Sequence, residues 1–314
     1  MKKIFRKFLL LAALVVLAVF LTQLSLSLVI PIKRIDFGQD LAEKQPGESL
    51  DVLVIGTSHG RAFRDMGLAD SATVYNASQS GLGIQPLIEK IRYIDKRKEV
   101  KNLIVFVDEW QISSESRSNY TKAYDNFVYD QEFAKQLLES GVSRPVLGRY
   151  FLGVCGNLPD LVYERIAGFR IEQQEAKFFD VETKPVKFID PAKAAGRSQK
   201  LYMGSTLDAA NNLSKKLSRY LSGLQKKGVR VIVCFPPLPL KFRDAAPVEA
   251  IEYKKIFIST AEESAIPVFD FSGELPDDQH YADEDHLTSS ESRDFSRERI
   301  LPLLDLGKGV PVEK

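Results

Sequence analysis

The sequence predicts a doubly wound α/β domain with a five-stranded parallel sheet, preceded by an N-terminal transmembrane helix. Three observations predict it. An uncharged segment long enough to cross a bilayer opens the chain, short runs of β-branched and aromatic residues recur after it, and helical patterns alternate with several of those runs. The chain has 314 residues, so the part that follows the first segment suffices for one large domain with its own core.

The opening apolar segment, residues 8–32, contains no charged residue. A bilayer core of about 30 Å requires about 20 apolar residues in a helix, so this segment can span it. Basic residues are more numerous before the segment than directly after it, which predicts a cytoplasmic N-terminus and an outside domain. The alternative is a cleaved signal peptide, whose apolar core is about 7 to 15 residues and ends at an A-x-A type site. Neither feature is present, and we expect an uncleaved anchor formed by residues 1–32.

Five later segments are predicted to be strands buried on both faces of a parallel sheet, because each is a near-continuous apolar run. They are residues 51–56, 73–77, 102–108, 229–235 and 267–271. Apolar residues recur at helical spacing at 85–97, 208–227 and 247–264. This alternation is typical of βαβ units and places the domain at 50–304, after a polar stalk at 33–49 and before a flexible tail at 305–314.

One interval is much longer than the others. About 120 residues separate the third and fourth predicted strands, whereas a crossover needs about a dozen. Residues 111–205 are therefore an insertion, rich in aromatic residues, with helical patterns near 130–140 and 158–175. Since it leaves the sheet at the carboxyl end of the third strand, we expect a cap over the site; a structural packing layer is the alternative.

Composition argues against several functions. The net charge is +1 at pH 7 and no long run of one sign occurs, so nothing favours nucleic-acid binding. Three histidines and two cysteines lack the spacing of metal ligands, and we expect neither a metal nor a cofactor. Cys234 lies in a predicted strand, where a buried thiol is expected; a disulfide with Cys155 is the alternative.

The run Gly56-Thr57-Ser58-His59 follows the first predicted strand. In parallel α/β folds the chemistry lies at the carboxyl ends of the strands, so Ser58 is the candidate nucleophile. The alternative is that these small residues only build a βα turn. His59 beside it is a possible substrate contact, but the description we favour is an exposed residue in the first helical turn.

An acid and a base lie near the other end of the chain, in Asp283-Glu284-Asp285-His286-Leu287. A serine hydroxyl needs a base to take its proton, and a carboxylate one turn away holds that base in one tautomer. We expect His286 as the base and Asp283 as its partner. His280 also has an aspartate three residues before it, but only His286 is followed by Thr288-x-x-Glu291, a capping box that opens a helix.

These motifs resemble those of the SGNH (GDSL-type) hydrolase superfamily, in particular its membrane-anchored bacterial branch near the polysaccharide O-acetylation proteins and the teichoic acid D-alanine transfer protein. Gly56-Thr57-Ser58 matches the first family block, Asn76 and Gly81 the second, and Asp283, His286 and Leu287 the last. The resemblance covers about 51–110 and 229–304. It implies a three-layer α/β/α flavodoxin-like fold, a Ser58–His286–Asp283 triad, and an oxyanion hole formed by the N–H groups of Ser58 and Gly81.

The resemblance fails after the third strand. The family has Gly-x-Asn-Asp there, and its oxyanion-binding asparagine aligns with Trp110 in this chain. An indole N–H could donate instead, with a different reach. Losing one oxyanion donor lowers the rate by about 10² to 10³. We regard Trp110, and Asn76 of the second block, as possible substrate contacts.

Two functions follow from the resemblance. The first is a serine esterase or O-acyltransferase for acylated envelope polysaccharide, held in the bacterial cytoplasmic membrane by one helix with its domain in the periplasm or outside the cell. The second is a non-catalytic module of the same fold that binds glycan or a multi-spanning membrane acyltransferase. Intact Ser58, Asp283 and His286 favour the first, and the missing asparagine favours the second.

Overall fold

The computed structural model describes residues 47–63, 72–115, 131–141 and 184–304, with isolated positions before residue 47. The chain divides into two compact units, one formed by Gln39–Lys122 with Ala176–Lys314 and the other by Met1–Gly38 with Ala123–Glu175. In the second unit the structure describes helix α8 (Gln131–Glu139), which confirms the helix expected near 130–140. The helical pattern near 158–175, Cys155, the tail and nearly all of segment 8–32 lie outside the described residues.

No helix in the described part of the chain has the length and apolar character that crossing a membrane requires.

The first unit contains a five-stranded parallel sheet in the order β2-β1-β3-β4-β5. Its strands are β1 (Ser49–Ile55), β2 (Val74–Asn76), β3 (Glu99–Phe106), β4 (Arg230–Phe235) and β5 (Val268–Asp270). This is the strand order of flavodoxin-like doubly wound sheets, so the predicted α/β domain with a five-stranded parallel sheet and its five strands are confirmed, whereas the predicted transmembrane helix is not. Such sheets carry their sites at the carboxyl ends of the strands, beside the point where the order reverses, which here lies between β1 and β3.

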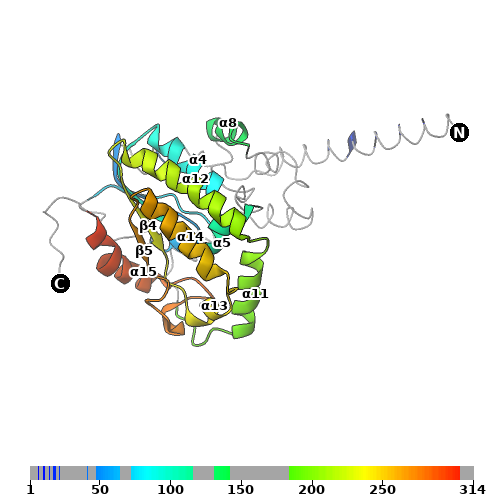
Figure 1. Cartoon of the computed structure of the whole chain (residues 1–314), viewed down its shortest axis with the longest axis vertical. Helices are drawn as coiled ribbons and strands as arrows, with labels where there is room; N and C mark the ends of the chain where they lie inside the picture. The colour runs from blue at the N-terminus through cyan, green and yellow to red at the C-terminus, as the bar shows by residue number, and fades with distance from the viewer. Residues whose placement is uncertain are drawn as a thin grey trace. The chain divides into compact units, whose positions relative to one another are not determined.

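Helices cover the sheet. They are α3 (Ser58–Arg61), α4 (Ile84–Asp95), α5 (Glu109–Ser113), α11 (Pro191–Tyr202), α12 (Leu207–Gln225), α13 (Leu240–Asp244), α14 (Ala250–Glu263) and α15 (Ser289–Phe295), with the short turns η1 (Asp278–His280), η2 (Ser296–Ile300) and η3 (Leu301–Leu303). The predicted helices at 85–97, 208–227 and 247–264 correspond to α4, α12 and α14. Figure 1 shows α12 and α14 packed side by side.

Alternate residues of the strands face one apolar cluster. Val54, Ile104 and Cys234 point into it from β1, β3 and β4, and Phe271 and Phe295 close it from the ends of β5 and α15. Cys234 is a free, buried thiol, as expected, and burial raises its pKa above the ordinary value of a thiol. Helices α12 and α14, which contribute no residue to this cluster, contact β4 and β5, and α4 packs against α12, which gives the three layers.

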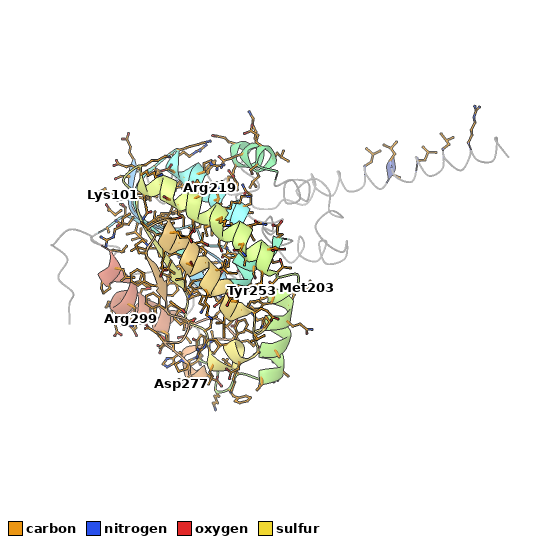
Figure 2. The ribbon with its side chains drawn as sticks, viewed as in Figure 1. Lys101, Met203, Arg219, Tyr253, Asp277 and Arg299 are labelled. Atoms are coloured by element: carbon orange, nitrogen blue, oxygen red, sulfur yellow. The ribbon has the colours of Figure 1, made fainter. Side chains whose placement is uncertain are left out.

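A second apolar cluster lies where four helices meet. Its buried members are Trp110, Tyr202, Ala210, Ala250 and Tyr253, from α5, α11, α12 and α14. Figure 2 labels Tyr253 on α14 and Met203 just after α11, which mark this part of the molecule. Trp110 therefore packs among helices in a hydrophobic core.

The described ends of the predicted insertion belong to the unit that contains the sheet. Val186 N–H donates to the Tyr281 carbonyl at 2.8 Å, Ile189 N–H to the Asp278 carboxylate at 3.0 Å, and Thr206 N–H to the Ser113 carbonyl at 2.8 Å. The residues grouped apart from the sheet are 123–175, a shorter stretch than the expected 111–205. The arrangement of a cap over the site stays a prediction.

Candidate active site

The turn that carries Ser58 is built by close approach of two strands. A Cβ on Gly56 would lie 2.5 Å from the Phe106 carbonyl oxygen, so β3 leaves room only for glycine there. Thr57 then caps α3, and its hydroxyl accepts a hydrogen bond from the His59 N–H at 3.4 Å. Thr57 and His59 are buried, whereas Ser58 is partly exposed. Ser58 is thus the most exposed of these three residues.

The loop after β2 is fastened to the Ser58 turn. The Asn76 side chain donates to the Gly60 carbonyl at 2.8 Å and accepts from the Ser78 N–H at 2.9 Å. Gly81 has a positive φ of 68°, a conformation that favours glycine. Among the described residues, no hydrogen bond takes up the N–H groups of Ser58 and Gly81. Asn76 therefore joins two turns, and both proposed oxyanion donors remain available.

The acid and the base lie in a short closed loop. Tyr281 and Leu287 form an antiparallel bridge, and Ala282 N–H donates to the His286 carbonyl at 2.8 Å. The loop leads directly into α15, whose N-cap Thr288 accepts from the Glu291 N–H at 3.3 Å, as the capping motif predicted.

His286 is paired with Asp283 as the sequence predicted. Its Nδ1 lies 2.9 Å from both Asp283 carboxylate oxygens, and its backbone N–H donates to the same carboxylate at 2.9 Å. Asp285 lies 3.0 Å from the same Nδ1. Burial alone would lower the pKa of His286, but Asp285 and Asp283 outweigh it and raise the pKa to about 9. With Nδ1–H donated to a carboxylate, the basic atom of the neutral ring is Nε2.

His59 differs from expectation. The sequence favours an exposed position for it, and this prediction is wrong, because the side chain is 5% exposed. Its Nδ1 lies 2.7 Å from Asp108 Oδ1, and its Nε2 lies 3.4 Å from Asp285 Oδ2. Burial would lower the pKa of His59, yet the two carboxylates raise it to about 10. His59 lies between these two carboxylates because β1 and β3 end side by side and the loop before α15 packs onto their ends.

The residue that reaches the Ser58 turn from the end of β3 is Asp108. Its carboxylate accepts the Thr57 hydroxyl at 2.6 Å and contacts His59. Trp110 lies in the helical cluster described above, and the intervening Glu109 pairs with Lys254 at 2.8 Å. The packing of Trp110 gives no support to its place in the oxyanion hole.

Asp285 also forms an ion pair with an arginine of the predicted insertion. Arg197 on α11 places its Nε 2.6 Å from Asp285 Oδ2. Burial would raise the pKa of Asp285, but His286 and His59 outweigh it and hold the pKa well below the usual value. Sequence position could have singled out two of these residues as members of the site, because Asp285 directly precedes His286 and Asp108 follows a predicted strand. No sequence pattern singles out Arg197.

His280 belongs to a different pair. It lies in η1, with its Nδ1 3.1 Å from Glu291, and it takes no part in the contacts of Asp283 or Asp285 that the structure describes.

The turn that contains Ser58 and the loop that contains His286 are close together at His59 and His286. The rings of His59 and His286 have centroids 5.1 Å apart and are tilted by 46°. Among the described residues, the Ser58 hydroxyl makes no hydrogen bond, so its pairing with His286 stays a prediction.

One group of side chains has the chemistry of metal ligands. One ligand atom from each of His59, Asp285 and His286 lies within 4.8 Å of the others. Asp285 is already paired with the Arg197 guanidinium, and both histidines face carboxylates. A dication would compete with these cations, so we interpret the group as buried ion pairs.

No family model matches the chain, and no curated protein matches its sequence. Among solved structures, the chain is similar to that of an acetyl xylan esterase, AlAXEase, with a TM-score of 0.42 and 12% sequence identity. The match covers 81% of this chain and 100% of that chain. The fold class rests on the strand order and register described above.

Proposed function

We propose that the chain is an SGNH-like serine esterase or O-acyltransferase that acts on acylated cell-envelope polysaccharide. The observation that carries the proposal is the packing of the Ser58 turn against the loop of Asp283 and His286, which brings the His59 and His286 rings to 5.1 Å. These segments are far apart in sequence and contain the nucleophile, base and acid that acyl transfer through serine needs.

In the proposed first step the Ser58 hydroxyl attacks the carbonyl carbon of an acyl ester, and its proton moves to Nε2 of His286. The carbonyl π electrons move to the oxygen, which the N–H groups of Ser58 and Gly81 stabilise. The oxyanion then collapses, the bond to the sugar oxygen breaks, and that oxygen takes the proton from His286. Asp283 stabilises the imidazolium between these steps.

The second step decides the class of the reaction. An acceptor hydroxyl gives its proton to His286 and attacks the carbonyl carbon of the acyl-serine. The bond between that carbon and the Ser58 oxygen then breaks, and His286 returns the proton to the Ser58 oxygen. Water as the acceptor makes the protein an esterase, and a glycan hydroxyl makes it an O-acyltransferase. The exposure of Ser58 permits either acceptor to approach.

One observation favours a second function, a non-catalytic module that binds glycan or a membrane-bound acyltransferase. Carboxylates raise the pKa of His286 to about 9. In most molecules the ring is therefore protonated at neutral pH and unable to accept a proton. Activity then requires either an alkaline shift or a substrate that lowers this pKa.

Labelling with a serine-reactive fluorophosphonate tests the proposal. The full chain in detergent should be labelled and Ser58→Ala should not, with Ser80→Ala as a control from the neighbouring loop that keeps its label. Labelling that persists in Ser58→Ala places the nucleophile elsewhere. An unlabelled but folded wild type favours the binding module.

The location is a separate part of the proposal. The uncharged segment 8–32 and the basic residues before it support a single anchor with the domain outside the cytoplasm. Alkaline phosphatase fused after about residue 45 should be active. An inactive phosphatase fusion together with an active cytoplasmic reporter at the same site contradicts this topology.

A further inference from the structure

A continuous line of buried contacts runs from the Ser58 turn to the proposed base. The Thr57 hydroxyl donates to Asp108 at 2.6 Å, and the other oxygen of Asp108 lies 2.7 Å from His59 Nδ1. His59 Nε2 lies 3.4 Å from Asp285, whose second oxygen lies 3.0 Å from His286 Nδ1. Three separate segments of the chain, at the ends of β1 and β3 and before α15, are thereby joined.

The geometry identifies the charge of His59. A neutral imidazole has one N–H and one lone pair, so it can satisfy only one of two carboxylates. Both ring nitrogens of His59 face a carboxylate, Asp108 on one side and Asp285 on the other. Asp108 and Asp285 are each 1% exposed, so water does not solvate their charges. A neutral ring would turn a lone pair toward one of these two buried anions, whereas the imidazolium form presents an N–H to each of them.

The charges around the proposed base come from three elements. Asp283 and Asp285 face His286 from its own loop, and His59 faces it from α3. Arg197 on α11 acts through Asp285, which it contacts at 2.6 Å. Two anions thus favour the protonated ring, whereas the nearby His59 cation opposes it and divides the attraction of Asp285 between two rings.

We propose that His59 is a positioning residue of the acyl-transfer site. Its imidazolium bridges Asp108 and Asp285, holds the Asp285 carboxylate in place, and limits how strongly that carboxylate favours the protonated form of His286. The inference depends on the proposed function for its effect on activity. The charge and the bridge of His59 are properties that can be measured without it.

The first measurement is a histidine NMR titration of the full chain in detergent micelles. The chain has only three histidines, so ring-labelled protein gives three signals, assigned with single variants. In His59→Gln the titration of His286 should move to higher pH by about one unit, because a neighbouring positive charge has been removed. His280→Gln, which removes the histidine paired with Glu291, should leave it unmoved. An unchanged His286 titration in folded His59→Gln overturns the proposal.

The second measurement is the pH dependence of kcat and KM for p-nitrophenyl acetate. In His59→Gln the acidic limb of kcat should shift upward, giving about tenfold lower kcat near pH 7 with KM unchanged, and the rate should recover at alkaline pH. A merely structural role would lower kcat at every pH without moving the limb, and that result contradicts the proposal. If the wild type is inactive but the NMR shift occurs, the proposed function fails and the bridging role of His59 stands.

Asp108→Asn covers the case in which His59→Gln does not fold. This variant keeps the ring and its size while removing the anion at Nδ1, so the His59 charge is weakened. His286 should again titrate at higher pH, by a smaller amount than in His59→Gln. A His286 titration identical to that of the wild type contradicts the proposal.

Discussion

The two buried histidines of this site both lie against carboxylates, but in different arrangements. His59 has one carboxylate at each ring nitrogen, Asp108 at Nδ1 and Asp285 at Nε2. The carboxylate contacts of His286 that the structure describes are all made through Nδ1, with Asp283 and Asp285. A ring clamped at both nitrogens holds charge and geometry, whereas a ring held at Nδ1 is suited to move a proton at Nε2. This difference is why we propose His286 as the base and His59 as a positioning residue.

Replacing the candidate base should have the largest effect on activity. His286→Ala removes the group that accepts the Ser58 proton, so kcat for p-nitrophenyl acetate should fall by about 10³-fold or more. The matched control is His280→Ala, which removes an imidazole paired with Glu291 and should keep activity within about threefold. Equal losses in the two variants, or a loss only in His280→Ala, would reverse the assignment.

Replacing His59, the clamped histidine, should also alter stability and the dependence of stability on pH. The pKa of His59 is about 10 in the folded chain, against 6.5 for the free group. Its contribution is therefore fully present below about pH 6.5 and is lost as the pH rises toward 10. His59→Gln should lower the free energy of unfolding by about 3 kcal/mol at pH 6 and by less at pH 9.5. Denaturant unfolding at both pH values measures this, and equal losses at the two would show that His59 is not a buried cation.

The smallest effect is expected at Trp110, which is buried with Tyr253 in the helical cluster. Trp110→Phe keeps an aromatic ring and should cost about 1 to 2 kcal/mol of stability, with kcat within about twofold of the wild type. Trp110→Asn should destabilise more and should not raise the esterase rate. A large loss of kcat in a stable Trp110→Phe protein would return the indole to the oxyanion hole.

Sequence patterns predicted the fold because local and long-range signals agree. Each strand is a short apolar run, and the helices α4, α12 and α14 have apolar residues at helical spacing. The Asp283–His286 pair was also predictable, since both residues lie in one loop and the capping motif at Thr288 marks where that loop ends.

The environment of His59 was not predictable in the same way. It depends on Asp108 and Asp285, which lie 49 and 226 positions further along the chain and meet His59 only after the sheet has formed. The environment of Trp110 was hard to predict for a related reason. The position at which β3 ends decides whether Asp108 or Trp110 reaches the Ser58 turn, and the ends of strands are poorly defined by apolar patterns.

The most direct test of the account is to map the acyl group of the intermediate. The full chain is mixed with p-nitrophenyl acetate, quenched with acid after a short time, digested and analysed by mass spectrometry. We predict one acetyl group on Ser58 in the wild type, and none in Ser58→Ala. Hydrolysis of the ester by wild-type protein that carries its acetyl group on another residue, or hydrolysis that persists in Ser58→Ala, would contradict it.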